Sequence, residues 1–177
     1  MEVLKYFCLC PTSCLLASVG LPLIFLRIFP AAFIKINIMK FPRDSRELYR
    51  VFRNASDPEL SELEGEYLVD MLTVWPSFKR FSHRKIFYRE NNKLLGHNVL
   101  LNVSWGRFFI EEDICKDLDS IKVAVINYNR PENLFHIRPI RDHIRRVDNG
   151  MYYIGRFNYL VSGRLIFLGY FSLEKIK

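Results

Sequence analysis

The chain has 177 residues, of which half are apolar and 15% aromatic, a composition that favours one compact, β-rich domain. Lysine and arginine exceed aspartate and glutamate by 26 to 19, but no run of five basic residues occurs. The excess therefore indicates a solvated basic surface more than a nucleic-acid tract. Of the four cysteines only Cys115 lies beyond the first 14 residues, which excludes a disulfide framework for the rest of the chain.

The N-terminal segment, residues 1–38, is apolar, and it carries no charge from Tyr6 to Leu26. A stretch of about 20 such residues can span a bilayer, so we expect a transmembrane anchor or an interfacial helix, with a signal peptide as the other alternative. Basic residues dominate the region 27–53, and the positive-inside tendency then places the following domain in the cytoplasm. A start at Met39 would omit this segment and leave the globular part complete.

Residues 39–64 are expected to form a helical linker or cap. Asp44 has the position of an N-cap and Glu47 that of the third helical residue. The helix that follows would be apolar on one face and basic on the other; the two sets are Leu48, Val51 and Phe52, and Arg46, Arg50 and Arg53. Such a helix fits either an anionic lipid surface or the open end of a barrel. A second, shorter helix is predicted from Pro58 to about Glu64.

Residues 65–177 are predicted to form an antiparallel β-barrel. Short apolar and aromatic runs recur every 10–15 residues and are separated by Asn, Gly, Asp and Pro; the runs are GEYLVDML, RKIFYRE, HNVLLNVSW, RFFIEE, IKVAVINYN, MYYIGRFNYL and RLIFLGYFSLEK. Seven or eight such strands favour a small closed up-and-down barrel, which leaves no exposed sheet edge. A two-sheet sandwich is the alternative.

Residues 137–147 are the most highly charged part of the chain and the hardest to interpret. Their isoleucines and Val147 recur at intervals of three and four, which favours a helical turn, whereas the surrounding pattern favours a strand. In a helix Asp142 would meet Arg145 and Arg146. We therefore predict that Asp142 is ionised and paired with arginine.

The segment PIRDHIRRVDNGMYYIG resembles the corresponding segment of uncharacterised lipocalin-like, or calycin-type, proteins. Asn127-Tyr128-Asn129 and Gly65-Glu66-Tyr67 are similar to further features of these proteins, although their Gly-x-Trp-x-Gly signature is absent. The resemblance covers residues 65–173 and is specific only around 139–155. It implies a barrel with an internal cavity that binds a hydrophobic small molecule, and it implies no reaction.

No motif typical of a metal or catalytic site occurs, so no metal and no cofactor are expected. Pockets combine apolar walls with a few polar groups, and two regions supply such groups: the strands around Trp105 and the charged segment around Asp142. The residues expected to bind a ligand are His97, Trp105, Arg107, Tyr128, Arg141, Asp142, His143 and Tyr153.

These features favour a membrane-associated barrel that binds a lipophilic or anionic-lipophilic small molecule. Its partners would be that ligand and membrane lipid, and no nucleic acid is expected. One alternative is an enzyme that acts on such a ligand with Asp142 or His143 as acid or base. Another is a structural subunit of a membrane-associated complex, which a filled barrel with an exposed apolar patch would favour.

Overall fold

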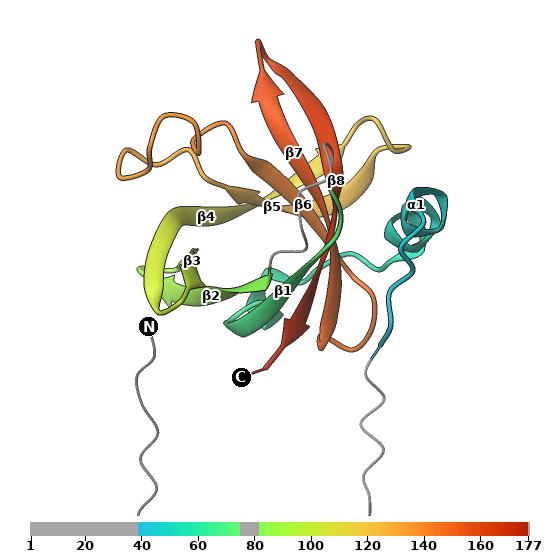
Figure 1. The fold of residues 1–177 in the computed structure, drawn as a ribbon, viewed down its shortest axis with the longest axis horizontal. Coiled ribbons are helices and arrows are strands. Elements are labelled where there is room, and N and C mark those ends of the chain that lie inside the picture. The colour runs from blue at the N-terminus through green and yellow to red at the C-terminus, as the bar shows by residue number, and fades with distance from the viewer. Residues whose placement is uncertain (1–38, 75–81, 177) are drawn as a thin grey trace, which may run out of the picture. The chain divides into compact units, whose positions relative to one another are not determined.

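The computed structural model describes residues 39–74 and 82–176. Within these ranges the chain forms one α-helix, α1 (Ser45–Asn54), a 3-10 turn, η1 (Leu60–Glu62), and eight strands. The strands are β1 (Gly65–Val74), β2 (Ser82–Glu90), β3 (Lys93–Leu100), β4 (Val103–Cys115), β5 (Ile121–Asn127), β6 (Arg141–Arg146), β7 (Tyr152–Val161) and β8 (Arg164–Lys175). They pair antiparallel in sequence order, and β8 pairs with β1 to close the barrel. The closed barrel is confirmed, and the sandwich is wrong (Figure 1).

Strand alternation divides the apolar residues between the barrel interior and its outer wall. On β5, Ala124 and Ile126 face the interior cluster, whereas Val123 and Val125 belong to a second cluster with α1. Both faces of β5 are therefore buried. Leu48 and Phe52 of α1 are fully buried in this second cluster, as the predicted apolar face requires.

The predicted N-cap is confirmed, but the position expected for the helix is wrong. The Asp44 carboxylate accepts hydrogen bonds from the backbone N–H groups of Arg46 and Glu47, at 2.9 and 3.0 Å. The apolar face of α1 packs on the outer wall of the barrel, so it neither closes a barrel end nor remains free for lipid. In Figure 1 the helix lies to one side of the strands.

The second predicted helix is reduced to η1, because the segment after α1 instead lies along the barrel. Ser56 exchanges backbone hydrogen bonds with Arg146, and Leu63 is fully buried in the interior cluster. The Lys175 ammonium donates to the carbonyl of Glu62 at 3.0 Å. These contacts close this end of the barrel, which we call the η1 end.

We call the opposite end the β3–β4 end. It carries the β3–β4 turn, the β5–β6 loop and the β7–β8 turn. Two-residue turns with positive φ at both positions join β2 to β3, β3 to β4, and β7 to β8; they are Asn91-Asn92, Leu101-Asn102 and Ser162-Gly163. The predicted run HNVLLNVSW is thus two strands and a turn. The predicted apolar segment 1–38 lies outside the described residues.

The helical turn predicted for residues 137–147 is wrong over its second half. Residues 135–139 form turns, but Arg141–Arg146 is strand β6, paired with β5 on one side and β7 on the other. Backbone hydrogen bonds to two neighbouring strands outweigh the local three-and-four spacing of the isoleucines. Ile144 then faces the interior, and Arg141, His143 and Arg145 face outward.

Candidate functional site

The barrel interior is filled by aromatic side chains over much of its length. Ring contacts run from Tyr153 through Tyr67, Phe87 and Phe108 to Tyr128, with centroids 5.1–5.8 Å apart. All four of these contacts are tilted or edge-to-face, the arrangements that aromatic pairs prefer. The η1 half of the interior is therefore a packed core.

Two interior glycines make room for these rings. A Cβ atom on Gly155 would lie 2.1 Å from the Phe171 ring, and one on Gly96 would lie 2.3 Å from both the Phe108 ring and the carbonyl oxygen of Ile86. Neither ring could keep its position beside an alanine. The two glycines thus let large rings lie flat against the barrel wall.

A buried set of polar side chains lies inside the barrel toward the β3–β4 end. We call Lys85, Asn98, Tyr128 and Asp142 the inner polar cluster. The Lys85 ammonium donates to Asn98 Oδ1 at 2.9 Å and to the Tyr128 hydroxyl, and it lies 3.6 Å from Asp142 Oδ2. The side chains of Lys85 and Asp142 are 4% and 5% exposed. Burying an ion pair this deeply costs solvation that the attraction between the charges only partly offsets.

Burial shifts the protonation of the inner polar cluster toward neutral forms. It raises the pKa of Asp142 to about 6, although the nearby Lys85 opposes the shift. Burial likewise lowers the pKa of Lys85, against the attraction of Asp142. Burial therefore opposes the charged forms of both groups, whereas their mutual attraction supports the ion pair.

Two further interior side chains lie beside the inner polar cluster. The rings of His83 and Trp105 are 5.8 Å apart, and burial followed by repulsion from Lys85 lowers the pKa of His83 to about 3. Among the described residues, the buried atoms Trp105 Nε1 and Asp142 Oδ1 have no hydrogen-bond partner. Unpartnered buried polar atoms are rare and need an explanation.

A local irregularity in β4 aims Trp105 at this cluster. Gly96 pairs with Phe108 and Asn98 with Trp105, so β4 holds one extra residue at this point. Gly106 there has φ +56, and a Cβ on it would lie 2.7 Å from Asn98 Nδ2. The bulge brings Trp105 opposite Asn98, on the interior face.

The predicted ligand-binding residues are divided by the strand alternation. Trp105, Tyr128, Asp142 and Tyr153 face the interior, with Tyr153 toward the η1 end beside Tyr67. The other four, His97, Arg107, Arg141 and His143, lie on the outer wall. Asp142 and His143 therefore face opposite sides of β6 and do not share one site.

The expected pairing of Asp142 with arginine is wrong. Its partner is Lys85, reached across the barrel, while Arg145 and Arg146 pair with carboxylates outside the inner polar cluster. Lys85 was missed because β2 carries a cation on each face, and alternation alone does not say which face is inside. The apolar neighbour Phe87, on the same face as Lys85, was the available signal.

A second buried polar group lies on the outer wall beneath α1, and we call Cys115, His143, Arg145 and Arg156 the outer polar cluster. Arg156 donates to Asp117 Oδ2 at 2.8 Å and to Cys115 Sγ at 3.3 Å. Its guanidinium carbon lies 5.8 Å from the Phe52 ring and 4.9 Å from that of Phe167. These contacts fix α1 and the β7–β8 hairpin to the wall.

Arg145 ties the segment after α1 to β5. Its guanidinium donates to the carbonyl oxygens of Ala55 and Lys122, the latter at 2.5 Å, and lies 3.1 Å from Asp57. His143 is buried beside Arg156, and burial followed by repulsion from Arg156 lowers its pKa to about 4. The outer polar cluster is thus built from groups that hold structural elements together.

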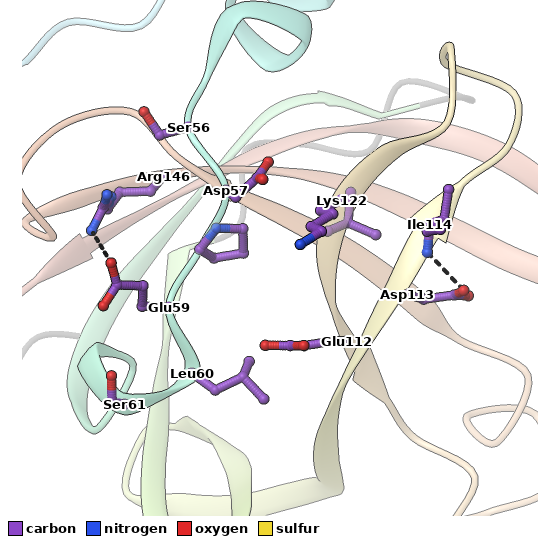
Figure 2. Close-up of a pocket in the computed structure, with 12 residues that line it drawn as sticks. Ser56, Asp57, Glu59, Leu60, Ser61, Glu112, Asp113, Ile114, Lys122 and Arg146 are labelled. Carbon is purple, nitrogen blue, oxygen red and sulfur yellow. Dashed lines mark hydrogen bonds and ion pairs between the residues drawn. The ribbon is translucent and has the colours of Figure 1, made fainter.

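A pocket of about 760 Å³ lies on the outside of the barrel. Figure 2 draws the residues that line it. Asp57 and Glu59 border it from the segment after α1, and Glu112, Asp113 and Lys122 from β4 and β5. Asp57 Oδ1 lies 3.1 Å from Arg145 Nη1, and Glu59 Oε1 lies 3.9 Å from Arg146 Nη1. No group of three or more metal-ligating side chains occurs among residues 39–74 and 82–176. The pocket is a largely polar gap between the segment after α1 and the outer wall of the barrel. None of the predicted ligand-binding residues lines it.

Comparison with known proteins gives no relative: no protein-family model and no curated protein sequence matches the chain. The lipocalin-like resemblance therefore remains a prediction, whereas the closed eight-stranded barrel is a property of the structure. Within the described part of the chain, no helix has the length and apolar character needed to cross a membrane.

Proposed function

We propose that the barrel binds a lipophilic small molecule with an anionic head group, held at its β3–β4 end. The observation that carries this proposal is the unsatisfied state of the interior there. Lys85 supplies a buried cation, and Trp105 Nε1 and Asp142 Oδ1 lack partners among the described residues. An anionic oxygen accepts from an ammonium and from an indole N–H, and the surrounding rings supply the apolar walls that such ligands require.

The Lys85 surroundings are suited to an amphipathic ligand. The Lys85 ammonium lies 5.1–5.8 Å from the ring centroids of Phe108, Tyr128 and Phe171. A carboxylate or sulfonate bound there would replace Asp142 as the counter-ion of Lys85. Asp142 would then take up a proton, because its pKa already lies near 6 without any added anion. Binding should therefore strengthen as the pH falls from 7 to 5.

The uncharged residues 6–26 favour work at a membrane surface, with the barrel on the cytoplasmic side. Such a surface would be the source of a lipophilic ligand.

Two fluorescent probes test the proposal on the full chain. Anilinonaphthalene sulfonate is lipophilic and anionic, and N-phenylnaphthylamine is lipophilic and neutral. In a Lys85→Met, Asp142→Asn variant, which buries no unpaired charge, we expect the sulfonate to bind about tenfold more weakly, as loss of a charge-assisted hydrogen bond implies. The neutral probe should bind almost unchanged.

The control is Lys93→Met, which removes an exposed lysine at the opposite end of the barrel. It should affect neither probe. Equal sulfonate binding by the wild type and the double variant would refute the proposal, as would a wild-type chain that binds neither probe.

A structural role is the second candidate, and a specific observation favours it. The η1 half of the interior is filled, and large apolar side chains are exposed on the barrel, including Leu101 and Phe135. Native mass spectrometry of the purified full chain separates the candidates. A retained small molecule supports binding, whereas a retained protein subunit supports the structural role.

A further inference from the structure

The β3–β4 end of the barrel exposes large apolar side chains on each of its described connections. Leu101 in the β3–β4 turn is 89% exposed, and Phe135 in the β5–β6 loop is 82% exposed. Further apolar residues more than 40% exposed flank these two and the β7–β8 turn; they are Val103, Leu134, Val161, Leu165 and Ile166. In Figure 1 the β3–β4 turn and the β5–β6 loop lie on the side of the barrel away from α1, and the β7–β8 hairpin projects at the top of the view.

The β5–β6 loop is anchored, so the exposure of Phe135 is built into the fold. The buried Asn133 side chain donates to the carbonyls of Arg107 and Tyr128, at 2.6 and 2.7 Å, and accepts from the Arg107 N–H at 2.8 Å. Arg138 donates to the Asn133 carbonyl at 2.9 Å. These bonds hold both sides of the loop, and its apex then points Leu134 and Phe135 away from the core.

Leu101 is unfavourable in two respects at once. Its φ of +48 lies in the left-handed region, where Gly and Asn are tolerated and a bulky side chain is not. The β2–β3 turn, at the other end of the barrel, has the same geometry, with φ +48 and +61, and there both residues are asparagine. Neither backbone geometry nor packing among the described residues accounts for a leucine at this tip. Strain of this kind points to a function.

The β5–β6 loop and the β7–β8 hairpin also carry basic residues. Arg130 and Arg138 lie in the β5–β6 loop, and Arg164 is the first residue of β8, directly after the β7–β8 turn. Glu132, which pairs with Arg130 at 2.9 Å, is the one acidic residue of residues 128–140. Apolar side chains projecting among basic ones suit a bilayer that carries negative charge. A protein partner would also cover apolar residues, but it would not by itself account for the surplus of arginine.

We propose that the β3–β4 end docks on an anionic lipid bilayer, with Leu101, Leu134 and Phe135 among the lipids and the arginines against the phosphates. This docking deepens the proposed function, since it would turn the ligand-binding end of the barrel toward the membrane. Only the purpose of the docking rests on the proposed function; the docking itself does not require ligand binding. The vesicle experiment below leaves Lys85 unchanged, so docking and ligand binding can fail separately.

A tryptophan reporter tests which surface meets the lipid in the full chain. Phe135→Trp places the reporter at the loop apex, and Tyr49→Trp places a control on the exposed side of α1. The signal of the two native tryptophans is subtracted using the wild type. With vesicles of phosphatidylcholine and phosphatidylserine brominated near the head group, we expect quenching at position 135 and none at 49.

Each other result overturns the proposal. Quenching at 49 alone, or at both positions, would show a different or unspecific docking surface. Co-sedimentation with no quenching at 135 would leave membrane binding to other parts of the chain, and absence of co-sedimentation would exclude docking. A reporter at 135 that becomes buried without lipid as the protein concentration rises would show contact with a second copy instead.

The strained turn supplies an independent test. Leu101→Asn should raise Tm by about 2–4 °C by relieving the backbone, and it should weaken vesicle binding about tenfold by removing one inserted side chain. The matched variant Asn91→Leu places leucine in the equivalent turn at the η1 end. It should lower Tm and leave vesicle binding unchanged. Unchanged vesicle binding by Leu101→Asn would contradict the proposal.

Discussion

The two buried polar clusters of this barrel differ in how far the carboxylates that pair with their cations are exposed to water. In the outer polar cluster, Arg145 and Arg156 reach Asp57 and Asp117, whose side chains are 56% and 61% exposed. In the inner polar cluster, Lys85 and Asp142 are both almost fully buried. An outer pair keeps one ion in water and so avoids most of the desolvation cost, whereas the inner pair bears it on both sides.

The clusters also differ in what they connect. Arg145 joins the carbonyls of two segments far apart in sequence, Ala55 and Lys122, and Arg156 joins the β4–β5 connection to β7. The inner cluster joins β2 to β6 across the barrel interior. Asp142 Oδ1 has no hydrogen-bond partner among the described residues, and the same is true of His143 Nδ1 and Arg156 Nε in the outer cluster. The outer cluster thus ties separate segments of the fold together, whereas the inner one buries both ions of its pair, a desolvation cost that ligand binding would explain.

The largest effect is expected from Arg145→Met. The change leaves the carbonyls of Ala55 and Lys122 without their donor and frees the segment after α1. Breaking a buried charged network of this kind costs about 3–5 kcal/mol, measurable by urea unfolding. Arg50→Met, on the exposed side of α1, is the control. A loss below about 1 kcal/mol, the worth of an exposed pair, would remove the distinction between the clusters.

Gly155→Ala tests whether the apolar part of the barrel interior is tightly packed. The new methyl group would overlap the Phe171 ring, so we expect a loss of about 1–3 kcal/mol. Phe171→Leu in the same chain should recover part of this loss by freeing space, as thermal unfolding of the single and double variants would reveal. An alanine variant as stable as the wild type would mean that the interior is loose.

Acid should weaken the outer cluster through His143. The unfolded chain protonates this histidine below about pH 6.5, whereas the folded pKa is about 4, so the stability contributed by neutral His143 is lost as the pH falls between these values. At pH 5 the loss is about 2 kcal/mol. His143→Gln should remove that part of the pH dependence, and replacement of the exposed His136 should not. Identical slopes for wild type and His143→Gln between pH 7 and 5 would disprove this account.

Asp142 contributes in the opposite direction. Burial raises its pKa in the folded chain to about 6, above the ordinary value of 3.8, so between these pH values the folded state holds a proton that the unfolded state has released. Its contribution to stability therefore declines as the pH rises from about 4 to 6. The wild-type slope over this range is the sum of the two opposed effects, which is why the His143 variant must be compared with the wild type.

The smallest effect is expected from Lys85→Met combined with Asp142→Leu. Replacing a buried ion pair by apolar groups is often neutral or stabilising, so the double variant should unfold within about 1 kcal/mol of the wild type. Lys85→Met alone should cost more, because it leaves Asp142 without its cation. A double variant as unstable as Arg145→Met would show that both clusters are structural.

Strand order, the helix over residues 45–54 and its Asp44 cap could be predicted from the sequence, because each depends on neighbours in the chain. Alternation along IKVAVINYN and the apolar spacing of α1 are local patterns that packing then preserves. The turn at Leu101-Asn102 was missed because leucine at positive φ is not a turn signal.

Tertiary structure alone decided which face of each strand is inside and which charges meet. Two-sided pairing of β6 overrode the helical spacing of residues 137–147 and turned Asp142 away from the adjacent arginines. Lys85 and Asp142 are 57 residues apart in sequence and meet only because closure of the barrel places β2 and β6 across a common interior. Contacts across a closed sheet depend on register and closure, and no local pattern of residues encodes either.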